Sequence, residues 1–156
     1  MIKIIFSLAV VLSTLACNKT NCGPDPVTAV EQIVFGVHHA ECMGDCSQNF
    51  QLTTTRIFAD TCDFCLITDI GFQTTPLPDE KFQIAKSLFE SGPAELLLNT
   101  AETVFGCPGC HDEGGYRLEI TKNGASHLYR WSEDFTDVPD NLRPYFEKVI
   151  QTLRDL

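Results

Sequence analysis

The fold is decided by residues 116–131, Tyr116-Arg-Leu-Glu-Ile-Thr-Lys-Asn-Gly-Ala-Ser-His-Leu-Tyr-Arg-Trp131. Two runs with alternating side chains flank an Asn-Gly dipeptide, which is the strongest short signal for a two-residue β-hairpin turn. This turn sets three facing pairs, Tyr116–Trp131, Leu118–Tyr129 and Ile120–His127. Because facing residues of a hairpin share one side of a sheet, we expect helices to cover these six side chains.

The opposite face of this predicted hairpin carries three charged side chains, Arg117, Glu119 and Arg130. Two arginines that face each other repel unless a carboxylate or a ligand lies between them. One interpretation is a solvated charge cluster that includes Glu119. The other is a small anion site, and the pattern leaves both open.

Helical patterns follow two parts of the chain. Leu77-Pro78-Asp79 precedes one helix, which Asp79 is expected to cap and which Gly92-Pro93 ends. Val138-Pro139-Asp140 precedes a second helix near the C-terminus. Apolar residues lie on one side of each, at positions 82, 85, 88 and 89 and at positions 142, 146, 149, 150 and 153.

A shift of 61 residues aligns 85, 88 and 89 with 146, 149 and 150, which indicates a tandem duplication of a strand–loop–hairpin–helix unit. The pseudo-repeats cover about 33–92 and 95–156, with apolar strands expected at 33–38 and 96–98. The predicted fold is therefore an α+β two-layer domain, in which two helices cover one antiparallel sheet of about six strands.

The first hairpin, centred on Thr54, is expected to place Phe50 opposite Phe58 and Cys46 opposite Cys62. This register predicts nested disulfides Cys46–Cys62 and Cys42–Cys65, with Cys107–Cys110 as a local third. The competing arrangement has the local pairs Cys42–Cys46 and Cys62–Cys65, and the sequence does not decide between them.

The N-terminus has the layout of a secretory leader. Lys3 precedes an apolar run that is shorter than a spanning helix, and Leu15-Ala16-Cys17 closes it. We expect a signal peptide at 1–16, a lipidated cysteine at Cys17 that carries palmitate-type chains, a polar tether at 17–28 and one domain at 29–156. Lipidation leaves an odd number of cysteines, and Cys22 in the tether is then the spare thiol.

Charge and cysteine content limit the partners. The chain has 21 acidic and 11 basic residues, a net charge of −10, which disfavours a nucleic-acid partner. Eight cysteines in an exported chain favour disulfides over free thiols. The expected location is the bacterial cell envelope, on the periplasmic or outer-membrane side. The lipid would hold the protein at the membrane, where an envelope protein is a possible partner.

The string Cys107-Pro108-Gly109-Cys110-His111 carries the sharpest chemistry in the sequence. Cys-x-x-Cys-His is the attachment motif of haem c, in which both cysteines bond the porphyrin and the histidine binds the iron. The same cysteines could form a dithiol redox site. Gly114-Gly115 and a predicted strand follow directly, whereas both kinds of site usually adjoin a helix, so the expected cofactor is none.

The sequence also contains residue types that are found in metal sites and in hydrolases. His38, His39, Cys42 and Cys46 have side chains of the type that bind zinc or copper, but adjacent histidines at a strand end point to opposite faces and oxidised cysteines do not bind metal. No metal site is therefore predicted. Hydrolase motifs such as Gly-x-Ser-x-Gly and His-Glu-x-x-His do not occur in the sequence, so no catalytic residue is predicted.

Two stretches resemble small lipoproteins of the Bacteroidota group that contain a domain of unknown function. They are residues 33–60, with the Cys42-Met-Gly-Asp-Cys46 loop, and residues 107–124 with the closing Val138-Pro139-Asp140 helix. The resemblance implies the envelope location and this fold, and no activity. The expected function is a disulfide-braced, non-catalytic lipoprotein with a binding, inhibitory or envelope-structural role. The alternative is a haem or dithiol protein that uses Cys107, Cys110 and His111.

Overall fold

The computed structural model describes residues 30–39, 46–61, 70–92, 102–110 and 114–156. The predicted leader, Cys17 and the tether lie outside these residues, as do Cys42, Cys62, Cys65 and His111. The elements are β1 (Val30–His38), β2 (Ser47–Thr53), β3 (Ile57–Ala59), α1 (Asp79–Ala85), α2 (Ser87–Ser91), β4 (Glu102–Phe105), β5 (Gly115–Lys122), β6 (Ala125–Ser132) and α3 (Arg143–Asp155).

The hairpin of β5 and β6 has the predicted register. Tyr116 faces Trp131, and the other two predicted pairs are also present. Asn123 and Gly124 have φ values of 53° and 73°, the left-handed conformation that a type I′ turn requires at both central positions. Local turn chemistry therefore fixes the register of the whole hairpin.

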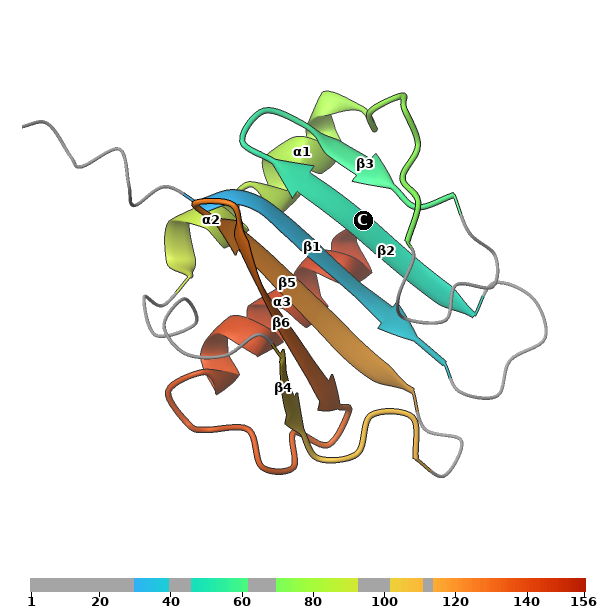
Figure 1. Cartoon of the computed structure of the whole chain (residues 1–156). Coiled ribbons are helices and arrows are strands. Elements are labelled where there is room, and N and C mark those ends of the chain that lie inside the picture. The colour runs from blue at the N-terminus through green and yellow to red at the C-terminus, as the bar shows by residue number, and fades with distance from the viewer. Residues whose placement is uncertain (1–29, 40–45, 62–69, 93–101, 111–113) are drawn as a thin grey trace, which may run out of the picture.

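The described strands form one six-stranded sheet in the order β3-β2-β1-β5-β6-β4 (Figure 1). Strand β1 lies at its centre, antiparallel to both β2 and β5. The α+β class is confirmed, with one difference: β4 pairs with β6 in parallel, so the sheet is mixed. The chain between β4 and β6 includes a whole antiparallel strand, β5, and such a connection allows a parallel pairing.

The first hairpin has a different register from the predicted one. Phe50 lies opposite Ala59, and Gln51 lies opposite Phe58. The turn is longer by one residue than expected: the Thr53 N–H donates to the Arg56 carbonyl, and the Thr53 hydroxyl accepts from the Arg56 N–H. A one-residue shift moves Phe58 to the other face of the sheet. The nested pair Cys46–Cys62 rests on the predicted register. Cys46 is disulfide-bonded, and because Cys62 lies outside the described residues this pairing stays a prediction.

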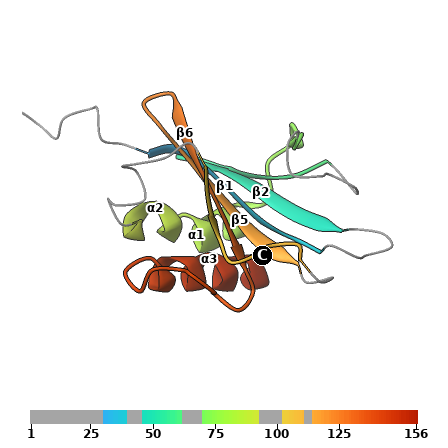
Figure 2. The same ribbon diagram turned by 60° about the horizontal axis from the view of Figure 1, so that its bottom comes forward.

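The helices all pack on one face of the sheet (Figure 2). The first predicted helix begins at Asp79 but is interrupted at Lys86, which separates α1 from α2. Asp79 is not its cap, since Pro78 holds the N-cap position and makes no side-chain cap bond. Asp79 and Glu80 instead place negative charge in the first turn, where the helix dipole favours it.

The core lies between this helical layer and the sheet. Trp131 is fully buried and stacks on Phe146 of α3, with ring centroids 4.2 Å apart. Phe146 also contacts the rings of Tyr129 and Phe105. These contacts confirm that helices cover the predicted face of the hairpin.

The two halves of the chain are connected differently in the sheet. Strand β1 pairs with β2, which follows it, whereas β4 pairs with β6 and not with β5. The tandem duplication stays a prediction, and the expected strand at 96–98 lies outside the described residues.

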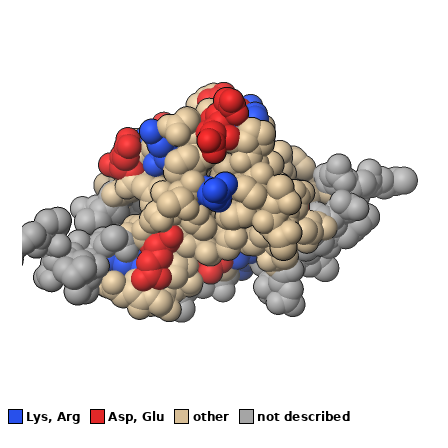
Figure 3. All heavy atoms as spheres, turned by 90° about the horizontal axis from the view of Figure 1, so that it is seen from above, with Lys and Arg blue, Asp and Glu red and all other residues tan. Residues whose placement is uncertain are grey.

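On the face that Figure 3 shows, acidic and basic side chains are interspersed among uncharged ones. Among the described helices, none is long and apolar enough to cross a membrane.

Candidate functional site

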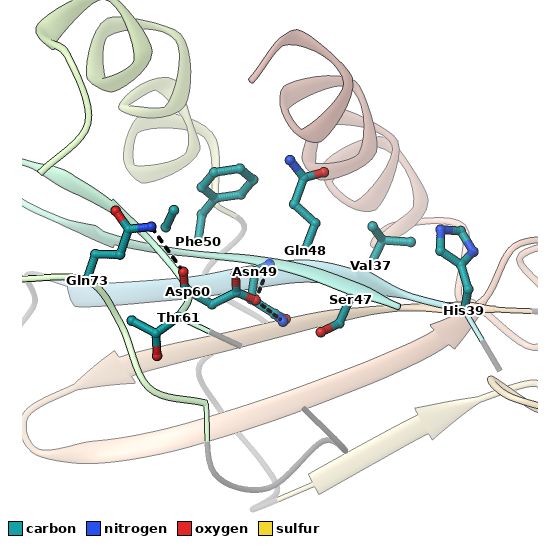
Figure 4. A pocket seen from close by; sticks show the side chains of 10 residues that line it. Val37, His39, Ser47, Gln48, Asn49, Phe50, Asp60, Thr61 and Gln73 are labelled. Atoms are coloured by element: carbon teal, nitrogen blue, oxygen red, sulfur yellow. Dashed lines mark hydrogen bonds between the residues drawn. The ribbon is translucent and has the colours of Figure 1, made fainter. Parts of the chain in front are cut away.

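A cavity of about 550 Å³ lies at the edge of the sheet, where β2 extends beyond the end of β3 (Figure 4). Strand β3 pairs only with Phe50–Leu52, so the first half of β2 continues past it. The cavity is lined by Val37, His39, Ser47, Gln48, Asn49, Phe50, Ala59, Asp60, Thr61 and Gln73. Its volume is within the range of small-molecule sites, about 300–1,000 Å³.

The main chain of β2 points towards this cavity. The Asp60 N–H donates to the Asn49 carbonyl at 2.9 Å, so the main-chain groups of Asn49 are directed to the outer edge. Main-chain groups alternate in direction along an antiparallel strand, and those of Ser47 therefore point to the same edge. Next to it, the Asp60 carboxylate accepts the Asn49 N–H, in the position where a strand would offer a carbonyl.

Asn49 and Asp60 form the rigid floor of the site. Asp60 Oδ2 accepts from both the backbone N–H and the Nδ2 of Asn49, at 2.9 and 2.8 Å. The Asn49 side chain lies across Gly36 of β1, where a Cβ atom would approach Asn49 Oδ1 to 2.2 Å. Asn49 is buried, with 4% of its surface exposed. Glycine at position 36 is thus a condition for this arrangement.

The Ser47 hydroxyl differs from the other polar groups of this cavity in its burial and hydrogen bonding. Its Oγ is buried and has no hydrogen-bond partner among the described residues. An unsatisfied buried hydroxyl costs free energy unless a ligand or water supplies the partner. Gln48, from the same strand, projects to the other side of the sheet (Figure 4).

Serine, histidine and aspartate all line the cavity, yet they are not arranged as a hydrolase triad. Ser47 and His39 point to opposite sides in Figure 4, and the Ser47 hydroxyl lacks a base. The Asp60 carboxylate binds Asn49. Nucleophilic catalysis needs the serine and its base within hydrogen-bond reach.

The predicted cysteine loop follows β4 and contains a disulfide between Cys107 and Cys110. This is the local pairing that the sequence predicted. The loop lies against the end of β1: a Cβ at Gly115 would lie 2.5 Å from Cβ of Pro108 and 2.9 Å from Cε1 of His38. Both sulfurs are occupied in this disulfide, so neither can bond a porphyrin in this state.

His38 lies in a positive environment beside this loop. Burial lowers the pKa of its imidazole below 6.5, and the charges of Arg130, His39 and Arg117 lower that pKa further. Desolvation and nearby cations both disfavour the protonated ring. The neutral form of His38 is therefore favoured near neutral pH.

The charged face of the β5–β6 hairpin is arranged as predicted. Arg117 lies opposite Arg130, and Arg117 Nη2 contacts Glu119 Oε2 at 2.6 Å. Glu119 thus supplies the carboxylate that the paired arginines need. The Arg117 side chain is only 12% exposed, so this ion pair is held close to the sheet rather than solvated.

A second cavity of about 360 Å³ lies beside the disulfide and is lined by Cys107, Cys110 and the 132–137 turn. In this turn the Asp134 carboxylate accepts from the hydroxyls of Ser132 and Thr136, at 2.6 and 2.5 Å. These bonds and the Thr136 N–H lower the pKa of Asp134 to about 2. Asp134 and Asp137 line the same cavity as Cys107 and Cys110.

The remaining predicted site residues are placed as follows. Cys46 is disulfide-bonded and precedes β2, while the other predicted disulfide positions 42, 62 and 65 and the predicted lipid site Cys17 lie outside the described residues. Within the part of the chain that the structure describes, no three His, Cys, Asp or Glu side chains gather as a metal site does.

No motif or spacing in the sequence predicts the cavity at the edge of β2, here called the β2-edge cavity. Its polar side chains are of ordinary types and come together through the pairing of β2 with β1 and β3. Two bonds between separate segments, Thr61 N–H to the Gly71 carbonyl and Gln73 N–H to the Ala59 carbonyl, complete the arrangement. Comparisons with models of known protein families and with curated proteins find no match for this chain.

Proposed function

We propose that this chain is an exported, lipid-anchored binding protein of the bacterial cell envelope, which holds its ligand in the β2-edge cavity without acting on it chemically. The observation that carries the binding role is the buried Ser47 hydroxyl, which lacks a partner and lines a cavity of ligand size. Support for the anchor comes from the leader and Cys17 in the sequence.

The surroundings of Ser47 favour binding over catalysis. Asp60 is fixed by two bonds from Asn49, and Ser47 has no activating base. Groups that are held in place by such bonds offer a preformed set of donors and acceptors, which lowers the entropy lost on binding.

The anchor is tested by metabolic labelling with an alkyne fatty acid in a bacterial host. The full chain is expected to be labelled and to fractionate with membranes, and the Cys17→Ser variant to lose the label. An unlabelled full chain would contradict the anchor and leave the binding role intact.

The binding role is tested separately, by amide NMR of the domain against a panel of small molecules and short peptides. A ligand that occupies the cavity is expected to shift the amide resonances of Ser47, Gln48 and Asn49. The Ser47→Ala variant is expected to bind that ligand with a higher Kd. The binding role would be contradicted if every ligand found in the panel shifts only amide resonances remote from β2.

A second candidate is the redox or haem function. The observation in its favour is the Cys107–Cys110 disulfide in the wall of the second cavity. Asp134 and Asp137 line the same cavity. Negative charge near a thiol raises its pKa and lowers its reactivity, which disfavours the redox function. The haem hypothesis is tested by expression with the periplasmic cytochrome-maturation system and a visible absorption spectrum. A Soret band that is absent from the His111→Ala variant would support haem attachment, and a colourless protein would contradict it.

A further inference from the structure

The lining of the β2-edge cavity specifies the chemistry of its ligand, if that cavity is the binding site proposed above. Its polar side chains are mostly uncharged amides and hydroxyls, namely Ser47, Gln48, Asn49, Thr61 and Gln73. Each offers both a donor and an acceptor. Such a set matches a ligand with many hydroxyl or amide groups, which likewise donate and accept hydrogen bonds.

Charge at the cavity argues against an ionic ligand. The described residues that line it include His39 but no lysine or arginine, so none of them is a permanently positive side chain that would neutralise an anion. The carboxylate present is Asp60, and its Oδ2 already accepts two bonds from Asn49. A cation would have to compete with these bonds, which are of the charge-assisted kind.

The polar groups lie on both sides of the strand edge. Ser47 projects to one side of the sheet and Gln48 to the other, and Gln73 approaches from the segment that pairs with Ala59 (Figure 4). The Gln73 amide already reaches the Asp60 carbonyl at 3.4 Å, a long bond that a better acceptor would replace. Apolar contact is available from Val37, Phe50 and Ala59.

We infer that the β2-edge cavity binds an uncharged, polyhydroxylated ligand, such as a neutral oligosaccharide. The Ser47 hydroxyl, the Gln48 and Gln73 amides and the Thr61 hydroxyl bond the ligand hydroxyls. Val37 and Phe50 contact its carbon skeleton. Asn49 and Asp60 hold the edge of β2 in place and are positioning residues.

The test is an amide NMR titration of the domain with four neutral trisaccharides: maltotriose, cellotriose, xylotriose and N-acetylchitotriose. At least one is expected to bind and to perturb the amides of Ser47, Gln48 and Gln73. Gln48→Ala and Gln73→Ala should each raise the Kd about three- to tenfold, the effect of one lost hydrogen bond. Gln83→Ala, an exposed position on α1, is the matched control and should leave the Kd unchanged.

Charged and peptide probes complete the experiment: a galacturonic acid trimer, a glucosamine trimer and tetra-alanine. Preferential binding of any of these at the same amides would overturn the polyol ligand and leave the binding role standing. Absence of binding by all four neutral trisaccharides would also overturn it. Binding that Gln83→Ala weakens as much as Gln48→Ala would place the ligand outside the cavity and contradict both proposals.

Discussion

The Asn49 amide donates to the carboxylate of Asp60 at 2.8 Å, and the Asn49 backbone N–H donates to the same oxygen at 2.9 Å. This pair closes the edge of β2 just beyond the last residue of β3. It joins residues eleven positions apart across the first hairpin. The pair therefore connects the stability of this edge to the shape of the cavity.

Asp60→Asn is expected to lower the free energy of unfolding by about 1–3 kcal/mol, because it replaces charge-assisted bonds by weaker ones and turns an amide towards an amide. Urea denaturation at neutral pH measures the change. The control is Asp140→Asn, at an exposed position before α3. Equal losses of unfolding free energy in the two variants would show that the Asn49–Asp60 hydrogen bonds do not stabilise the fold beyond an ordinary surface contact.

Phe146→Ala is expected to lower the free energy of unfolding by about 3–5 kcal/mol. Phe146 is fully buried and contacts the rings of Trp131 and Tyr129 from β6 and of Phe105 from β4. Phe146→Leu retains much of the volume and should lose less. A loss below about 1 kcal/mol for the alanine variant, the size of an ordinary surface change, would contradict the described core.

Tyr145→Phe tests how α3 holds α2. The Tyr145 hydroxyl donates to the Leu88 carbonyl at 2.9 Å, in a buried contact, and burial raises the pKa of Tyr145. Removal of the hydroxyl leaves the Leu88 carbonyl without that donor, which should cost about 1–2 kcal/mol in thermal or urea unfolding. An unchanged stability would show that α2 does not depend on this bond.

The lowered pKa of His38 predicts a dependence of stability on pH. The unfolded state binds a proton near 6.5 and the folded state only at lower pH, so unfolding takes up a proton in the window below 6.5. Stability should therefore fall as pH drops from about 7 to about 5, in addition to the effect of the carboxylates.

His38→Gln should flatten this part of the profile, measured as urea midpoints across the same window. His127→Gln keeps the number of histidines equal to that in His38→Gln and retains His38, so it should keep the slope. A slope as steep in His38→Gln as in the unchanged protein would refute the assignment.

The parts of the fold that the sequence predicts well are those set by neighbours in the chain. Asn123-Gly124 fixes the register of β5 and β6 through the left-handed backbone angles that this dipeptide strongly favours, and alternation then places Trp131 in the core. The first hairpin has no such dipeptide. Its turn is closed by the Thr53 hydroxyl, and a register one residue away satisfies the same apolar pattern apart from Phe58.

The candidate site was not predictable for a similar reason. Ser47, Asp60 and Gln73 belong to three segments, which come together through the pairing of β2 with β3 and through the bonds of residues 59–61 to residues 71–73. The parallel pairing of β4 with β6 is likewise non-local. The cysteine loop was visible in the sequence because its two partners are three residues apart.

The binding role at the β2 edge is tested most directly by mapping which amides move when a ligand from a panel of neutral sugars, charged sugars and short peptides is added to the domain. We expect the largest NMR shifts at Ser47, Gln48, Asn49 and Gln73, and a higher Kd from the same titration in the Ser47→Ala variant. Shifts centred on the Cys107–Cys110 loop, with the β2 edge unchanged, would contradict the account.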